Sequence, residues 1–549
     1  MHYTGPERSA RGPAVVFVSP QEHRRVVFAT SLGTIFEWYD FYLYATLAPF
    51  FASLLFPPGN DTAALLSAFA TYAAGFLIRP VGALVFGRLG DRYGRKYAFL
   101  ITMVLMGAST FAIGLLPAFE QIGWLAPLML VLLRLAQGFA VGGEYGGACA
   151  YVAEWTPRQI RGLATGWIQT TATVGFLLSL LVIVVCRGSI PPDQFKEWGW
   201  RIPFLLSIVL LMFSAYIRLR LKESPLFLQL RAAGHLSPAP IAESFLRLPN
   251  ARYAFFALFG AAAGQGVVWY TGQFYVLYFL QFTLKVDYNL AYQLIMIALL
   301  ISTPLFIFFG WLSDKIGRKP IMLAGCLLAV LTYFPIFGGL TRAVNPDLVT
   351  FQRTTPVILA VDEDTCNFHF LVGPWSSFSD CDEAKNYLTK LGLSFQIVDT
   401  LGSAGFIRIG DQTDISIDEW GAKNRGEEVM RALKAKGYPL KANPIKMNLP
   451  VIIFLLTIMM IYVCMVYGPM AAFLVELFPT HIRYTSLSLP YHLGNGWFGG
   501  MLPLAVTSMV AESGNIYFGL WYPISVAAIT FIIGLAFLPD RYGRELLHD

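Results

Sequence analysis

The sequence predicts an all-α polytopic membrane protein with twelve transmembrane helices in two six-helix halves and a small α/β extracytoplasmic insertion. Three observations support this fold class. Only 13% of the 549 residues are charged, about half the share found in soluble domains, and the mean hydropathy is +0.56. Twelve apolar segments are each long enough to cross a bilayer. Two sequence patterns occur once in each half of the chain.

The predicted spans are apolar runs close to the length of about 20 residues that crosses ~30 Å of hydrocarbon. The first run is too long for a signal peptide and is not followed by a small-residue cleavage pattern, so we expect it to remain as a span. The runs lie at 26–54, 62–87, 97–117, 124–153, 163–186, 200–217, 253–281, 289–312, 320–340, 448–474, 485–510 and 515–538.

The first repeated pattern follows the second and eighth predicted spans. It reads Gly87-Arg-Leu-Gly-Asp91-Arg-Tyr-Gly94-Arg95-Lys96 in one half and Gly310-Trp-Leu-Ser-Asp314-Lys-Ile-Gly317-Arg318-Lys319 in the other. The second pattern follows spans four and ten, where a Glu precedes an Arg by seven positions: Glu154 and Arg161, then Glu476 and Arg483. The copies of the second pattern lie further apart than the copies of the first, which indicates an insertion between spans nine and ten.

These patterns divide the chain into two similar halves, and parallel repeats of this kind place a substrate site between the halves near mid-membrane. The predicted parts are an N-terminal tail (1–25), a first half (26–217), a linker (218–252), spans seven to nine (253–340), an insertion (341–447), spans ten to twelve (448–538) and a C-terminal tail (539–549).

Lys and Arg are concentrated in the two tails and in alternate short loops. The positive-inside rule therefore predicts that both termini are cytoplasmic. On this topology the tails and the linker 218–252 face the cytoplasm, and the insertion 341–447 lies outside it. We expect a multi-pass protein of the cell inner membrane.

The loop pattern resembles the signature of the major facilitator superfamily, with Lys315 replacing the first Arg in the second copy. A finer resemblance is to the metabolite:H+ symporter family, which includes proline/betaine, dicarboxylate, citrate and shikimate permeases. It rests on Gly33-Thr-Ile-Phe-Glu37-Trp-Tyr-Asp40-Phe, Arg79-Pro-Val-Gly, Arg134-Leu-Ala-Gln137-Gly-Phe-Ala-Val-Gly-Gly-Glu144, Trp200-Arg-Ile-Pro-Phe, Glu223-Ser-Pro and Tyr467-Gly-Pro-Met-Ala-Ala-Phe-Leu-Val-Glu-Leu-Phe-Pro. The resemblance covers the whole chain except the N-terminal 25 residues and the insertion. Family members have a short loop at the position of the insertion.

The charged residues of the repeated patterns are predicted to gate the transporter rather than to bind substrate. They lie at helix ends, where a carboxylate near a helix N-terminus and an Arg partner are favourable. The resemblance implies that they clip helices together on the cytoplasmic side and separate during switching. The predicted gating residues are Asp91, Arg95, Asp314, Arg318, Glu154, Arg161, Glu476 and Arg483.

Five ionisable residues fall well inside the predicted spans, where a charge usually faces a partner or an aqueous cavity. We expect Asp40 to carry the coupled proton and Arg134 to be its electrostatic partner. Glu37, three positions before Asp40 on the same helix face, is the alternative carrier, and Glu144 is a weaker one. The fifth residue is Arg79, and either Arg79 or Arg134 is a candidate for holding a carboxylate. The alternative interpretation is a static buried ion pair.

Spans seven and eleven are unusually rich in amide and aromatic side chains. Polar groups among aromatics are typical of a small-molecule site, although they also form hydrogen bonds between helices. The predicted substrate-binding residues are Arg79, Gln137, Gln265, Trp269, Tyr270, Gln273, His492 and Asn495.

The insertion is predicted to be a small α/β domain. Strand-like runs lie at 356–361 and 395–398, and helical patterns lie at 382–391 and 419–437. An oxidising compartment would favour a disulfide between Cys366 and Cys381, and two free thiols are the alternative. His369 is the only His in the insertion and no C-x-x-C occurs, so no metal site is expected.

The sequence and the resemblance together predict a secondary active transporter that imports a small polar metabolite, such as an organic acid or a zwitterionic osmolyte, with protons. The expected partners are this substrate, protons and the bilayer, with no nucleic acid and no cofactor, and the chain is expected to act as a monomer. No enzyme motif appears and no catalytic residue is predicted. A proton-driven exporter of amphipathic compounds and a non-transporting membrane sensor are the alternatives.

Overall fold

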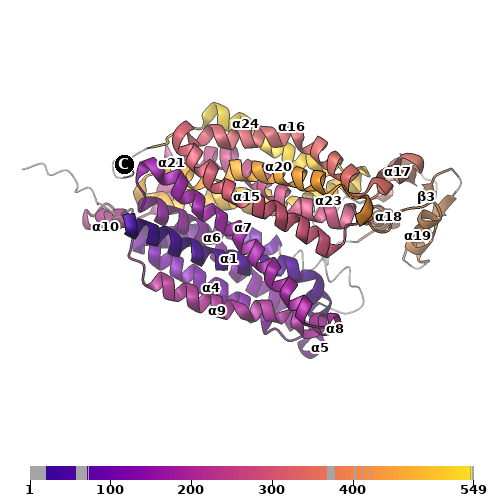
Figure 1. Ribbon diagram of the computed structural model, residues 1–549, viewed down its shortest axis with the longest axis horizontal. Helices are drawn as coiled ribbons and strands as arrows, with labels where there is room; N and C mark the ends of the chain where they lie inside the picture. Colours follow the sequence, from indigo (N-terminus) through magenta and orange to yellow (C-terminus); the bar gives the residue numbers. More distant parts are fainter. Residues whose placement is uncertain are drawn as a thin grey trace, which may run out of the picture.

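The computed structural model describes residues 20–56, 71, 73–367, 377–400, 404–411, 413–421, 423–543 and 546. Two helical halves lie side by side, and the insertion projects from one end of the second half (Figure 1). The start of α1 and the described C-terminal residues lie at the opposite end. We call that end the termini face and the other the insertion face.

The first half follows the predicted order of spans. Its main helices are long and apolar, and short helical turns connect them at the two faces. Its helices are α1 (Pro20–Leu55), α3 (Arg79–Tyr93), α4 (Arg95–Gly114), α5 (Phe119–Ile122), α6 (Leu125–Glu154), α7 (Arg161–Ser189), α8 (Pro192–Gln194) and α9 (Arg201–Leu219), followed by the linker helices α10 (Pro225–Ala232) and α11 (Pro240–Phe245).

In the second half, spans seven and eleven contain π-helical turns. Span seven consists of α12 (Asn250–Ala257), η3 (Leu258–Ala262), α13 (Ala263–Tyr270), η4 (Thr271–Tyr275), α14 (Val276–Tyr278) and η5 (Phe279–Thr283). Span eleven consists of α22 (Arg483–His492), η9 (Leu493–Gly499) and α23 (Leu502–Ser513). The remaining helices are α15 (Tyr288–Ile316), α16 (Arg318–Val344), α20 (Leu449–Tyr467), α21 (Met470–Leu477) and α24 (Trp521–Phe537).

Ten helices in the described part of the chain are long and apolar enough to cross a membrane. The two other predicted spans correspond to α1 and to the run from α22 to α23. The second span is described from residue 73 onward, and most of its predicted start at 62–72 lies outside the described residues. The predicted fold class is confirmed.

The two copies of the loop pattern place a glycine at the same break between helices. Gly94 separates α3 from α4 with φ of 127°, and Gly317 separates α15 from α16 with φ of 97°. Residues with a side chain rarely adopt this region of φ. Each break therefore orients the Asp at the end of one helix and the Arg that begins the next.

The described part of the insertion contains a four-stranded sheet and three α-helices. The sheet has the order β2-β1-β3-β4, in which only the β1–β2 pair is parallel. The elements are α17 (Pro346–Thr354), β1 (Val357–Val361), α18 (Asp380–Lys390), β2 (Gln396–Asp399), β3 (Phe406–Ile409), β4 (Thr413–Ser416) and α19 (Arg425–Ala435). The predicted strands and helices match four of these elements, and α16 extends four residues beyond the predicted boundary at 340, to Val344.

The insertion packs onto the second half at the insertion face. The backbone N–H of Phe395 donates to the carbonyl of Gly514 at the end of α23 (2.8 Å), and that of Ala442 donates to the carbonyl of Lys285 beside span seven (3.0 Å). Lys385 of α18 forms an ion pair with Glu512 (3.3 Å). The insertion therefore contacts spans seven and eleven of the second half.

Candidate functional site

The eight predicted gating residues form two clusters at the termini face. In the first, Asp91 at the end of α3 accepts backbone hydrogen bonds from Tyr484 (3.2 Å) and Thr485 (2.8 Å). These N–H groups belong to the first turn of α22, where a helix has no internal acceptors. Asp91 therefore caps a helix of the other half.

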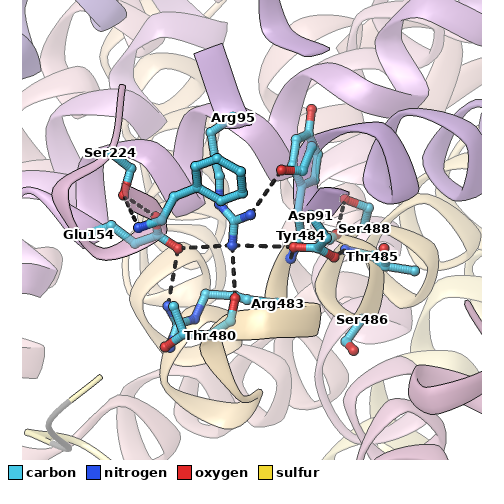
Figure 2. A network of polar contacts seen from close by, with 12 residues as sticks. Asp91, Arg95, Glu154, Ser224, Thr480, Arg483, Tyr484, Thr485, Ser486 and Ser488 are labelled. Atoms are coloured by element: carbon cyan, nitrogen blue, oxygen red, sulfur yellow. Dashed lines mark hydrogen bonds and ion pairs between the residues drawn. The ribbon is translucent and has the colours of Figure 1, made fainter. Parts of the chain in front are cut away.

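Arg95 holds the rest of this first cluster together, as Figure 2 shows. Its guanidinium forms ion pairs with Asp91 (3.2 Å) and Glu154 (3.4 Å) and donates to the carbonyl of Thr480 (2.8 Å). Arg483 of the second half also pairs with Glu154 (3.1 Å). The cluster thus joins α3, α4 and α6 of the first half to α22 of the second.

The second cluster repeats this arrangement with the halves exchanged. Asp314 at the end of α15 accepts from the backbone N–H groups of Gly162 and Leu163, both at 2.8 Å, in the first turn of α7. Arg318 pairs with Asp314 (2.7 Å) and Glu476 (3.1 Å). Arg161 of the first half pairs with Glu476 (2.7 Å). We call the two clusters together the latch.

A small cavity lies between the halves, further from the termini face than the latch. Its lining comes from α1, α3, α6 and α7 of the first half and from α20 and α22 of the second. The lining residues are Thr34, Glu37, Trp38, Phe41, Arg79, Val141, Glu144, Tyr145, Ala148, Ile168, Gln169, Tyr467, Tyr491 and His492. Four predicted site residues are among them: Glu37, Arg79, Glu144 and His492.

Aromatic side chains of the two halves meet between the cavity and the latch. The rings of Tyr145 and Tyr491 stack with their centroids 3.5 Å apart and their planes 6° apart. The Tyr467 and Tyr491 hydroxyls lie 3.1 Å apart, and Gln169 donates to the Tyr145 hydroxyl (2.9 Å). These contacts form the floor of the cavity.

A second aromatic layer joins the halves on the side of the insertion face. Trp38 of α1 packs against Trp269 of α13, with ring centroids 6.2 Å apart. One turn further along α1, Tyr42 packs against Phe274 (5.6 Å), which also contacts Phe176 of α7 (5.4 Å). Aromatic contacts between the halves therefore lie on both sides of the cavity.

Arg79 has a free hydrogen-bonding edge at the cavity. Its guanidinium carbon lies 4.4 Å from the ring centroid of Phe41 and 4.1 Å from that of Phe76. Only 2% of the side chain is exposed, and its Nε and Nη2 atoms have no hydrogen-bond partner among the described residues. Both ring nitrogens of His492 also lack a partner there. The cavity thus presents buried polar groups that need a partner.

Glu37 and Glu144 supply two carboxyl groups to the same cavity. Glu37 accepts a hydrogen bond from Arg218 in the last turn of α9 and forms an ion pair with it. Arg218 is not among the predicted site residues, because the predicted sixth span ends at 217 and the residue is therefore assigned to the linker. Its burial within α9 makes it part of the bundle.

Asp40 and Arg134, which the sequence analysis pairs, contact different partners in the described part of the chain. Asp40 accepts a hydrogen bond from Ser207 of α9 (2.6 Å), and it is not among the lining residues of the cavity. Arg134 donates to Gln137 one turn further along α6 (2.7 Å), and Gln137 donates to Thr110 of α4 (2.7 Å). Each side chain finds a closer partner on a neighbouring helix or turn, because burial favours the nearest complementary group.

Several predicted substrate-binding residues are not among the lining residues of the cavity. Gln265 and Asn495 exchange hydrogen bonds between spans seven and eleven (3.1 and 2.7 Å), which is the helix-to-helix alternative. Trp269 belongs to the aromatic layer, and Tyr270 packs against Phe76 with ring centroids 5.7 Å apart. Neither side-chain amide atom of Gln273 has a hydrogen-bond partner in the described part of the chain.

Most of the aromatic residues that line the cavity are also absent from the predicted site, although they lie within or next to motifs quoted in the sequence analysis. Trp38 and Phe41 flank Glu37 and Asp40 in the first span, and Tyr467 begins a quoted motif. Aromatic residues are common in membrane spans, so spacing alone does not distinguish cavity lining from lipid contact.

The insertion contains the pairing of Cys366 with Cys381 that the sequence predicts, with Cα atoms 5.4 Å apart. Cys149, Cys186, Cys326 and Cys464 are free thiols. The described residues contain no group of three or more His, Cys, Asp or Glu side chains that would hold a metal ion. His369 lies outside the described residues.

Comparison with known proteins agrees with the architecture. Residues 30–348 match the family model of the Major Facilitator Superfamily. The chain is 34% identical over 357 residues to the glycine betaine/proline/ectoine/pipecolic acid transporter OusA of Dickeya dadantii, covering 63% of this chain and 70% of that protein. It is 36% identical over 320 residues to the shikimate transporter of Escherichia coli, covering 58% and 72%.

Solved structures show the same fold. The proton:xylose symporter XylE bound to 6-bromo-6-deoxy-D-glucose superposes with a TM-score of 0.61 at 17% sequence identity. The alignment covers 96% of this chain and 98% of that structure.

Proposed function

Because this chain belongs to the major facilitator superfamily, we propose that it is a proton-coupled symporter that imports a small metabolite bearing a carboxylate. The relatives named above transport betaines, proline, ectoine, pipecolic acid or shikimate. These compounds are small organic acids and zwitterions. The class of substrate follows from the chemistry of the cavity.

Arg79 is the observation that carries this proposal. The Nε–Nη2 edge of a guanidinium presents two parallel N–H groups, which match the two oxygens of a carboxylate. In Arg79 both atoms are buried at the cavity without a partner among the described residues. A buried donor without a hydrogen-bond partner destabilises the protein. A substrate carboxylate that accepts hydrogen bonds from both atoms removes this cost, and the gain contributes to the free energy of binding.

The rest of the cavity suits the remainder of such a molecule. The faces of Trp38, Tyr145 and Tyr491 border the cavity, and aromatic faces attract quaternary ammonium groups and pack against rings. Glu37 and Glu144 add acidic groups. A zwitterion could place its carboxylate at Arg79 and its cationic or ring portion among the aromatic side chains. It would then contact both the basic and the aromatic parts of the cavity.

Transport by alternating access requires the latch and the aromatic layers to open in turn. The halves would then rotate about the fixed site between them. Opening toward the termini face breaks both latch clusters, and opening toward the insertion face separates Trp38 from Trp269. The latch residues thus take the gating role. Of the residues expected to couple protons, Glu37 and Glu144 line the cavity, so we place the coupling at this pair, and Asp40 with Arg134 is the alternative.

We also propose the topology that follows from the distribution of Lys and Arg: both termini are cytoplasmic and the insertion is extracytoplasmic. The cavity lies between two halves of one chain, which supports a monomer as the functional unit.

Uptake by proteoliposomes tests the function. An inward proton gradient should drive accumulation of radiolabelled glycine betaine, proline or shikimate, and a protonophore should abolish it. Arg79→Lys keeps the charge but loses the fork, so it should weaken binding about tenfold or more. Arg88→Gln, an exposed change on the same helix, is the matched control. Accumulation that needs no proton gradient, or an unchanged affinity in Arg79→Lys, would overturn the proposal.

A further inference from the structure

Arg218 is a buried cation that has no role in the proposed function described above. It lies in the last turn of α9 with only 1% of its surface exposed. Its guanidinium carbon lies 3.5 Å from the ring centroid of Phe99 in α4, and its Nη1 donates to Glu37 Oε1 in α1. Arg218 thus spans α9, α4 and α1 to reach an acidic residue that lines the cavity.

Gly33 makes room for this contact. A Cβ atom at this position would lie 2.7 Å from Arg218 Nε and 2.9 Å from Nη2, closer than packed atoms approach. Gly33 precedes Glu37 by one helical turn, so both residues lie on the same face of α1. The helix therefore provides a notch for the guanidinium and, one turn later, the carboxylate that receives it.

Glu144 faces Glu37 within the cavity. Both residues line it, and their carboxyl groups are within hydrogen-bonding reach. Glu37 Oε2 has no donor among the described residues. Two carboxyl groups form a hydrogen bond only when one of them carries a proton. Because Glu37 already accepts a hydrogen bond from Arg218, the proton of this pair belongs on Glu144.

Other titratable groups from each neighbouring helix also face this pair. They are Arg79 from α3, Tyr467 from α20, Tyr484, Tyr491 and His492 from α22, and Tyr145 and Cys149 from α6 itself. Arg79 is the only one of these with a permanent charge.

We propose that Glu144 carries the transported proton as the donor to Glu37, and that Arg218 is the positioning residue that keeps Glu37 ionised. This inference rests on the proposed function and deepens it. With Glu144 protonated, Glu37 and Arg218 balance each other, and Arg79 retains its positive charge for a carboxylate. With Glu144 ionised, its charge offsets that of Arg79. Each ligand therefore favours binding of the other, which is the thermodynamic requirement for symport.

Infrared spectroscopy of the purified full-length protein without substrate tests the placement of the proton. At neutral pH, Glu144→Gln should remove one protonated-carboxyl stretching band relative to the wild type. Arg218→Gln should add one such band, because Glu37 then has no cation to keep it ionised. The double variant Glu37→Gln with Arg218→Gln should show no added band, which assigns the new proton to Glu37.

Matched variants separate charge from packing. Arg218→Lys keeps the cation and should leave the band area unchanged, and Arg220→Gln, an exposed change two residues on, should do the same. Gly33→Ala displaces the guanidinium without removing it, so it should reproduce part of the Arg218→Gln gain.

An unchanged band area in Glu144→Gln would overturn the placement of the proton. An unchanged area in both Arg218→Gln and Gly33→Ala, or a gain that persists in the double variant, would overturn the role of Arg218. Because no substrate is present, these results are independent of whether the transport proposal holds. If Arg218→Gln does not fold, the band area of Gly33→Ala tests the role of Arg218, and that of Glu144→Gln tests the placement of the proton.

Discussion

Asp91 of the first half accepts a hydrogen bond from the backbone N–H of Thr485 in the second half, at 2.8 Å. Asp314 repeats this relationship in the opposite direction with Leu163, also at 2.8 Å. In each pair the acceptor is the Asp of the loop pattern, and the donor lies in the first turn of a helix of the other half. The duplicated sequence pattern thus produces two reciprocal helix caps, which close the termini face together with their Arg and Glu partners.

Removing the charge of these caps should open the termini face more often. Asp91→Asn and Asp314→Asn each weaken the interaction with a helix N-terminus, an effect of about 0.3–2 kcal/mol. Cys149 is fully buried between the cavity and the latch, so its alkylation by N-ethylmaleimide reports the opening. Mass spectrometry should show alkylation of Cys149 roughly two- to thirtyfold faster than in the wild type.

Asp287→Asn provides the control for the latch experiment. Asp287 also caps a helix, α15, but at the insertion face. The same chemical change there should leave alkylation of Cys149 unchanged. Wild-type rates in both latch variants would show that the caps do not hold this face closed.

The fold and the latch were predictable from sequence because both depend on patterns that repeat along the chain. Apolar runs of membrane length and two duplicated motifs identify the halves, and the charged residues of the motifs meet where the repeat requires. The cavity was only partly predictable. Gln265 and Asn495 are as polar as Arg79, yet they satisfy each other across two helices, and sequence spacing does not show which polar groups pair.

Arg218 illustrates the same limit at a span boundary. A predicted span ends where its apolar run meets a charged residue, so a charge in the last turn of a span is assigned to a loop. The structure instead buries it against Glu37, because Gly33 leaves the space for its guanidinium.

Substitutions of Glu144 and of Asp40 should affect proton coupling differently. Glu144→Gln should abolish accumulation driven by a pH gradient while leaving substrate exchange measurable, because the neutral amide mimics the protonated acid. Asp40→Asn keeps an acceptor for Ser207 outside the cavity lining, so accumulation should persist. The comparison uses initial rates of uphill uptake and of exchange in the same proteoliposomes. Loss of uphill uptake in Asp40→Asn alone would return the coupling role to Asp40.

The insertion should be reachable from outside the cell. Ser377 is exposed, so a cysteine introduced there should react with a membrane-impermeant maleimide in intact spheroplasts. A cysteine at Arg231 in the linker, also exposed, should react only after permeabilisation. The reverse pattern would invert the topology.

The disulfide of the insertion should be present in protein purified without reductant. Peptides carrying Cys366 and Cys381 should be found joined by mass spectrometry, and Cys366→Ser with Cys381→Ser should destabilise the insertion. The sequence separation is 15 residues, and a loop of that size corresponds to about 3 kcal/mol in the chain-entropy model. Alkylation of both thiols without reductant would contradict the disulfide.

A cryo-electron microscopy structure with bound ligand tests whether Arg79 holds the carboxylate of the substrate. Among glycine betaine, proline and shikimate, the compound that binds most tightly should lie in the cavity between the halves. Its carboxylate should lie within hydrogen-bonding distance of Nε and Nη2 of Arg79, with the rest of the molecule among Trp38, Tyr145 and Tyr491. A ligand bound elsewhere, or one whose carboxylate faces away from Arg79, would contradict the account.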